Sequence, residues 1–149
     1  MLNPALKYSD RGLKMTARFE GCRLKAYKDQ VGVLTIGYGH TLGVVEGMEC
    51  TMAQALAWLE QDIARVETQL NRDLKIQVDQ DEFDALVDFA FNLGLHALEH
   101  STLWAKLNKG DFAGAAAEFP RWSHAGGKEV EGLLKRRLEE QALFLHKAG

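Results

Sequence analysis

Residues 22–40 read CRLKAYKDQVGVLTIGYGH, and this stretch decides the fold class. In its first seven residues apolar and polar side chains alternate, which is the period-2 pattern of a half-buried strand. The segment DQVG that follows predicts a turn, and the β-branched and aromatic run VLTIGYG predicts a returning strand. The stretch therefore predicts a small β-hairpin or a three-stranded sheet.

Helices are predicted on both sides of this stretch. Residues 9–20 form a short helix in which Ser9 or Asp10 supplies the N-cap and Gly21 ends the last turn. From Thr51 onward, capping residues followed by apolar residues at spacings of three and four predict helices. These helices are predicted to begin near residues 51, 79, 101 and 111 and after the glycine loop at 125–127.

The pattern as a whole predicts an α+β fold that is mostly helical. A small β-hairpin or sheet lobe and a larger helical lobe would together form a single domain over residues 1–149, which is an ordinary domain length. Because ligands commonly bind between unequal lobes, we expect a cleft between these two.

Composition and charge exclude several classes of protein. Apolar residues make up 46% of the chain and charged residues 26%, as in an ordinary globular domain. Residues 1–28 are basic, but residues 29–100 carry thirteen acidic and three basic side chains, which argues against a nucleic-acid binder. Neither a long apolar run nor an apolar leader in the first eleven residues is present, so we expect no stable membrane insertion and synthesis in the cytosol. The two cysteines are expected to be free thiols.

Glu20, Asp29 and Thr35 are the candidate catalytic residues. Glu20 ends the first predicted helix, Asp29 lies in the predicted turn and Thr35 on the returning strand, so a hairpin can bring them close together. Cleavage of a glycosidic bond uses two carboxyl groups, one to protonate the leaving oxygen and one to activate water or attack. The alternative is three unrelated surface residues, because this spacing alone is not specific.

The longer string around these residues carries a family resemblance. EGCRLKAYKD at residues 20–29, Gly32 and TIGYGHT at residues 35–41 closely resemble the phage-type lysozymes, or endolysins, of the T4- and P22-like kind. The resemblance extends over about residues 10–145, in order and spacing. Its further motifs are Phe83-Asp84-Ala85-Leu86, Phe91-Asn92-Leu93-Gly94, Trp122, Ala125-Gly126-Gly127-Lys128, Gly132-Leu133, Arg136-Arg137, Glu140 and Leu143-Phe144.

The resemblance implies a lysozyme-like fold in one catalytic domain and a muramidase reaction. Members hydrolyse the β-1,4 bond between N-acetylmuramic acid and N-acetylglucosamine of bacterial peptidoglycan, with inversion. Glu20 would be the catalytic acid, and Asp29 and Thr35 would hold the attacking water. No metal and no cofactor is implied. We expect a monomer that stays in the host cytoplasm until a holin releases it to the cell wall or periplasm, where it lyses the host at the end of a phage cycle.

Five further residues are predicted to bind the substrate. Tyr27, Tyr38 and Phe91 offer flat apolar faces to sugar rings, although Phe91 also fits simple core packing. Lys128 and Arg137 are predicted to contact the substrate, with ordinary solvated surface charge as the alternative.

Two sets of histidines are given other interpretations. His40 is predicted to make a structural ion pair, with Asp62 as a plausible partner. His96 and His100 are four residues apart, as in a helical metal pair, but no carboxylate or cysteine completes a site with them.

Two other functions remain open at this point. A lytic transglycosylase cuts the same bond with a single glutamate, which would leave Asp29 and Thr35 without a role. A catalytically silent wall-binding relative is the second alternative, and the presence of all three residues argues against it.

Overall fold

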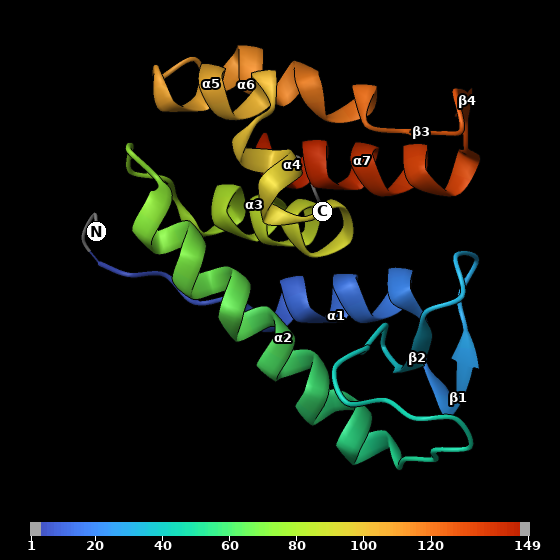
Figure 1. Cartoon of the computed structure of the whole chain (residues 1–149). Coiled ribbons are helices and arrows are strands. Elements are labelled where there is room, and N and C mark those ends of the chain that lie inside the picture. The colour runs from blue at the N-terminus through green and yellow to red at the C-terminus, as the bar shows by residue number, and fades with distance from the viewer. Residues whose placement is uncertain (1–3, 147–149) are drawn as a thin grey trace. The chain divides into compact units, whose positions relative to one another are not determined.

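The computed structural model describes residues 4–146. Residues 1–3, which are part of the segment in which no apolar leader was expected, lie outside the described residues. Figure 1 shows a mostly helical chain with one hairpin near its N-terminal end. Contacts divide the chain into a smaller unit, Leu13–Arg65, and a larger unit that joins the residues up to Gly12 to those from Val66 onward. An α+β fold that is mostly helical is confirmed.

The smaller unit contains the predicted hairpin. Strand β1 (Arg23–Lys28) pairs antiparallel with β2 (Leu34–Gly37), with Tyr27 opposite Thr35. The other edge of β1 forms an isolated antiparallel bridge between Lys25 and Glu49. The sequence predicted either a hairpin or a three-stranded sheet. The structure has a two-stranded hairpin with one additional bridging segment.

Helix α1 (Asp10–Glu20) precedes this hairpin and α2 (Met52–Asp73) follows it. Ser9 Oγ accepts the N–H of Gly12, so Ser9 is the N-terminal cap of α1. Thr51 and Gln54 form the predicted capping box of α2, each side chain accepting the other residue's backbone N–H at 3.1 and 2.9 Å.

The larger unit is a set of packed helices. They are α3 (Gln80–Leu93), α4 (Leu95–Glu99), α5 (Thr102–Asn108), α6 (Phe112–Glu118), the 3₁₀ turn η1 (Phe119–Arg121) and α7 (Glu131–Phe144). Helix α3 packs against α7, and α5 against α6 (Figure 1). The apolar stripe of α3, with Phe83, Leu86 and Phe89 fully buried, forms the core of this unit.

A short helix and a short hairpin were not predicted from the sequence. Helix α4 has only five residues, and it begins directly after Gly94, whose φ of 99° interrupts the helical backbone. The glycine loop at residues 125–127 connects β3 (His124–Ala125) to β4 (Lys128–Glu129), a very short hairpin. Among the described residues, no helix combines the length and apolarity that a membrane crossing requires.

Candidate active site

Glu20 is the last residue of α1 and is half-buried. The next residue, Gly21, has a φ of 67°, and its N–H bonds to the carbonyl of Ala17 at 3.0 Å. Glycine takes this left-handed conformation without strain, so it ends the helix and turns the chain into β1. The Glu20 carboxyl group is thereby held at a defined helix end.

Gly39 lies directly against the Glu20 carboxyl group. A Cβ atom placed on Gly39 would come within 2.8 Å of Glu20 Oε1, and the φ of Gly39 is 77°. The surrounding turn is tight, because Ile36 and His40 exchange two backbone hydrogen bonds of 2.9 Å. Only a residue without a side chain lets the carboxyl group come this close to the backbone of the turn.

Asp29 begins the turn between β1 and β2. Its Oδ1 atom accepts the backbone N–H groups of Val31 and Val33, both at 2.9 Å. The N–H of Asp29 bonds in turn to the carbonyl of Val33 at 2.9 Å. The exposed carboxylate is thus fixed by the loop that it begins. Both bonds use Oδ1, so they leave the Oδ2 atom to accept a hydrogen bond or a proton from another group.

Thr35 lies on β2 opposite Tyr27, and the residue is only 4% exposed. Its hydroxyl donates a hydrogen bond of 3.0 Å to the carbonyl of Val33. The hydroxyl oxygen keeps its lone pairs, so it can still accept a hydrogen bond from a water. Val33 therefore connects the Asp29 carboxylate and the Thr35 hydroxyl through one peptide segment.

His40 anchors the turn that carries Gly39. Its side chain is 7% exposed, Nδ1 lies 2.9 Å from Asp62 Oδ2, and the ring stacks on Trp58 with centroids 4.8 Å apart. Asp62 also pairs with Arg65 one turn further along α2. The predicted partnership of His40 with Asp62 is confirmed.

Tyr27 and Tyr38 belong to the same unit as the three candidate residues, and both are half-buried. The guanidinium of Arg23 lies 4.3 Å from the centre of the Tyr27 ring, which orients that ring. Burial, followed by the nearby Cys22 thiol, raises the pKa of Tyr38, so this side chain is a neutral phenol at neutral pH.

The other predicted substrate residues belong to the larger unit. Phe91 is half-buried on α3, and Lys128 is exposed on β4. Arg137 on α7 is fully buried, with its Nε atom 2.7 Å from Glu140 Oε1 and its guanidinium over the Phe89 ring. Its place within the helical core gives Arg137 a structural partner, and its role in binding stays a prediction.

A buried charge cluster continues from Arg137 along α7. Arg136 donates two hydrogen bonds of 2.9 Å to the carboxylate of Asp88 on α3. Burial, followed by the neighbouring Asp88, raises the pKa of Glu140 well above its ordinary value. The sequence indicates Arg136 and Glu140 only as motif positions, because a buried ion-pair network has no sequence signal of its own.

The arrangement in the smaller unit fits acid–base chemistry. It holds one carboxyl group, Glu20, at a helix end, and it holds a second carboxylate with a hydroxyl, Asp29 and Thr35, on a hairpin. Such a set can protonate a leaving oxygen and activate a water.

The sequence pattern that defines the phage lysozyme family matches residues 17–140. The chain belongs to the phage lysozyme family. An endolysin of Acyrthosiphon pisum secondary endosymbiont phage 1 is 46% identical over 140 residues, which are 91% of this chain and 96% of that protein. An endolysin of Bacillus phage PZA is 45% identical over 93% of this chain, but the chain spans only 55% of its length.

A solved structure agrees with this assignment. The muramidase domain of SpmX from Asticaccaulis excentricus superposes with a TM-score of 0.88 at 34% identity, covering 93% of this chain and 97% of that domain. This phage lysozyme is thus a lysozyme-type glycoside hydrolase, and the expectation of an endolysin-like enzyme is confirmed.

Proposed function

We propose that this phage lysozyme hydrolyses the β-1,4 bond between N-acetylmuramic acid and N-acetylglucosamine in peptidoglycan, with inversion at the anomeric carbon. Glu20 is the general acid, Asp29 the general base, and Thr35 positions the water. The observation that carries the proposal is the shared anchoring on Val33. Asp29 Oδ1 accepts the Val33 N–H at 2.9 Å, and the Thr35 hydroxyl donates to the Val33 carbonyl at 3.0 Å.

The reaction is a single displacement. Glu20 gives its proton to the glycosidic oxygen, and the bond from that oxygen to the anomeric carbon breaks. Water attacks the same carbon from the opposite face, while Asp29 takes a proton from it. At the end Glu20 is ionised and Asp29 protonated, and proton exchange with solvent restores both groups. No step in this sequence calls for a metal or cofactor.

Thr35 and Gly39 support this chemistry by position. The Thr35 hydroxyl uses its proton on Val33, so it meets the water as an acceptor and orients one of the water's protons away from Asp29. Gly39 keeps its backbone beside Glu20 Oε1, where a side chain would displace the acid. The positions of the water and of the Glu20 carboxyl group matter for the rate, because small displacements of catalytic groups lower the rate by large factors.

Five residues are proposed to bind the polysaccharide and its peptide stems. Tyr27 and Tyr38 in the smaller unit offer ring faces and hydroxyl edges to the sugars. Phe91, Lys128 and Arg137 in the larger unit are proposed to contribute an apolar face and two positive charges.

In biological terms the chain is a peptidoglycan-hydrolysing lysis enzyme that acts on the cell wall. We infer that it works as a monomer at the end of a phage cycle. It would be held in the host cytoplasm until a holin opens the membrane. The relationship to phage endolysins supports this order of events.

Mass spectrometry of fragments released from purified peptidoglycan tests the bond chemistry. Hydrolysis in water enriched in ¹⁸O should give reducing-end N-acetylmuramic acid that carries one labelled oxygen. An anhydro end without the label would identify a lytic transglycosylase instead. No fragments at all, from protein shown to be folded, would identify a silent wall-binding relative.

A further inference from the structure

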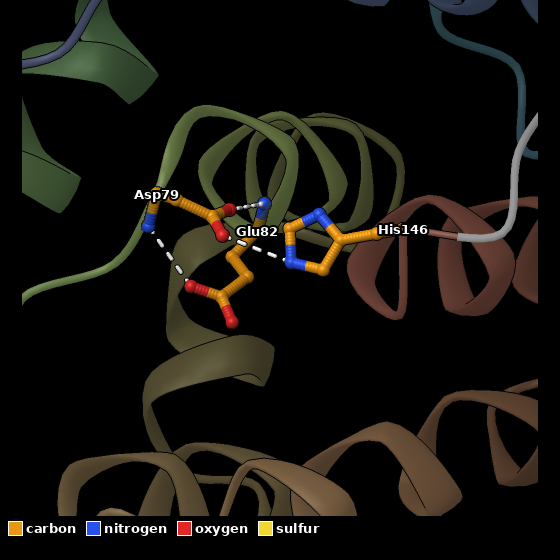
Figure 2. Close-up of side chains that lie close together, drawn as sticks. All are labelled: Asp79, Glu82 and His146. Atoms are coloured by element: carbon orange, nitrogen blue, oxygen red, sulfur yellow. Dashed lines mark hydrogen bonds and ion pairs between the residues drawn. The ribbon is translucent and has the colours of Figure 1, made fainter.

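His146 closes the described part of the chain two residues after the end of α7, and it reaches the N-terminus of α3. Its Nε2 atom lies 2.9 Å from Asp79 Oδ2, and its Nδ1 atom lies 3.0 Å from Asp81 Oδ2. Figure 2 shows the imidazole ring pointing at the carboxyl groups of Asp79 and Glu82. All four residues belong to the larger unit.

The capping box of α3 holds the two carboxyl groups in place. Asp79 Oδ1 accepts the N–H of Glu82 at 2.8 Å, and Glu82 Oε1 accepts the N–H of Asp79 at 2.9 Å (Figure 2). Each carboxylate thus uses one oxygen in the capping box, and these bonds leave its second oxygen available as a ligand. The three side chains converge, since one ligand atom from each of Asp79, Glu82 and His146 lies within 4.8 Å of the others.

We propose that Asp79, Glu82 and His146 bind one divalent transition-metal ion of the zinc class. Ligands at about 2.1 Å from a tetrahedral zinc ion are about 3.4 Å apart, so separations between 2.9 and 4.8 Å need only small side-chain rotations. Nitrogen together with carboxylate oxygen favours zinc over magnesium or calcium, which prefer oxygen alone. Water would complete the fourth position.

Asp81 adds the outer contact that such sites use. A histidine that binds a metal through one ring nitrogen commonly donates the N–H of the other to a carboxylate, which fixes the ring. Here Asp81 accepts from Nδ1 and leaves Nε2 facing Asp79 and Glu82. Zinc would take the place of the proton on Nε2. Asp81 is therefore a positioning residue and not a ligand.

Among residues 4–146 this is the one group of three or more histidine, cysteine, aspartate or glutamate side chains whose ligand atoms converge. The rival pair, His96 and His100, stacks its rings with centroids 4.0 Å apart. The His100 Nδ1 atom also lies 2.9 Å from the carbonyl of His96. The site at His146 would be structural, joining the chain segment after α7 to the start of α3, and it takes no part in the hydrolysis proposed above.

Zinc binding to the untagged protein by isothermal titration calorimetry tests the proposal. Wild type should bind one Zn²⁺ and no Mg²⁺ under the same conditions. At a zinc concentration about 100-fold above Kd, its melting temperature should rise by about 5 °C or more. His146→Ala should weaken binding by about 100-fold or more, and Asp81→Asn by about 10- to 100-fold. Glu82→Gln keeps an oxygen for the capping bond to Asp79 and should also weaken binding.

His100→Ala is the matched control, because it removes an exposed imidazole elsewhere in the same unit and should leave zinc affinity unchanged. Circular dichroism and metal-free melting show whether each variant is folded. His146 is 49% exposed, so its removal should leave the metal-free fold intact. Equal zinc binding by wild type and His146→Ala, or loss of binding only in His100→Ala, would overturn the proposal. So would the absence of saturable binding to wild type.

Discussion

Asp29 and Thr35 bond to opposite ends of the same residue, Val33. The Asp29 carboxylate accepts the Val33 N–H at 2.9 Å, and the Thr35 hydroxyl donates to the Val33 carbonyl at 3.0 Å. The backbone of Asp29 adds a third bond, from its N–H to the same carbonyl at 2.9 Å. The position of the base therefore depends on the turn, and the position of the hydroxyl depends on the strand that follows it.

Asp29→Asn separates the charge of this residue from its structural bonds. The asparagine Oδ1 can still accept the N–H groups of Val31 and Val33, so the turn should keep its shape. Loss of the general base should lower kcat by about 100-fold or more. We expect the melting temperature to change little, whereas Asp29→Ala should lower it by removing both bonds. Wild-type turnover by Asp29→Asn would exclude Asp29 as the base.

Gly39→Ala should reduce activity by moving Glu20. The new Cβ atom would meet Glu20 Oε1 at 2.8 Å, and the φ of 77° would strain an alanine by about 1–2 kcal/mol. A displacement of the acid by about 1 Å can lower the rate by about 100-fold.

Gly43→Ala is the matched control for this prediction. Gly43 has a similar φ of 73°, but a Cβ atom there would meet no other atom within 4 Å. Urea unfolding should therefore report a similar loss of stability for both variants, while turnover should fall only in Gly39→Ala. Equal turnover in the two variants would mean that the contact with Glu20 has no catalytic consequence.

His40→Ala should destabilise the protein and spare the chemistry. It removes the contact with Asp62 and the stacking on Trp58, at a cost of about 2 kcal/mol, or about 4–8 °C in melting temperature. Turnover per folded molecule should stay near that of wild type. The exposed His124 is a suitable control, and His124→Ala should change stability by about 0.5 kcal/mol or less. A loss of turnover without loss of stability would instead make His40 part of the reaction.

The pattern of the chain predicted the elements whose signals are local. The capping boxes at Thr51 and Asp79, the glycine stop at Gly21 and strand β1 each have signals within a few residues, and the structure contains all of them. Burial along β1 does not follow the predicted alternation, since the apolar Leu24 is exposed like its polar neighbours. Helix α4 was missed because five residues after a glycine carry too little periodicity to be recognised.

Contacts between distant residues were less accessible. The pairing of His40 with Asp62 could be anticipated, because His40 directly precedes the loop that leads into α2 and Asp62 lies on that helix. The bonds to Val33 could not be anticipated, because they use its backbone N–H and carbonyl, which are the same in almost every residue type. His146 was overlooked for a related reason: its partners Asp79 and Asp81 lie more than sixty residues earlier, and only the packing of α7 against α3 brings them together.

The pH dependence of stability should reflect Glu99 at the end of α4. Burial, followed by the hydrogen bond with Asp73, raises the pKa of Glu99 to about 7 from an ordinary 4.5. The folded state therefore keeps a proton that the unfolded state loses. The stability this supplies is fully present below about pH 4.5 and is lost as the pH rises through about 7.

Glu99→Gln should remove this dependence, because the amide cannot lose a proton and can still bond to Asp73. Its stability relative to wild type should rise between about pH 5 and about pH 8, as measured by urea unfolding. The pKa of Asp73 is lowered, chiefly by its hydrogen bond with Arg72, so its own effect falls in acid, outside this window. Glu60→Gln, on an exposed position of α2, should show no such trend. A parallel pH profile for Glu99→Gln and wild type would contradict the prediction.

Turnover of purified peptidoglycan by Glu20→Gln, beside wild type and Glu49→Gln, tests whether Glu20 is the catalytic acid. Glutamine keeps the size of the Glu20 side chain but has no carboxyl proton to give to the leaving oxygen. Glu49 is an exposed glutamate in the same unit, so its variant controls for the loss of one charge. Folded Glu20→Gln protein should release no reducing-end fragments, whereas wild type and Glu49→Gln should release them fully. Release by Glu20→Gln at a rate near that of wild type would show that Glu20 is not the acid.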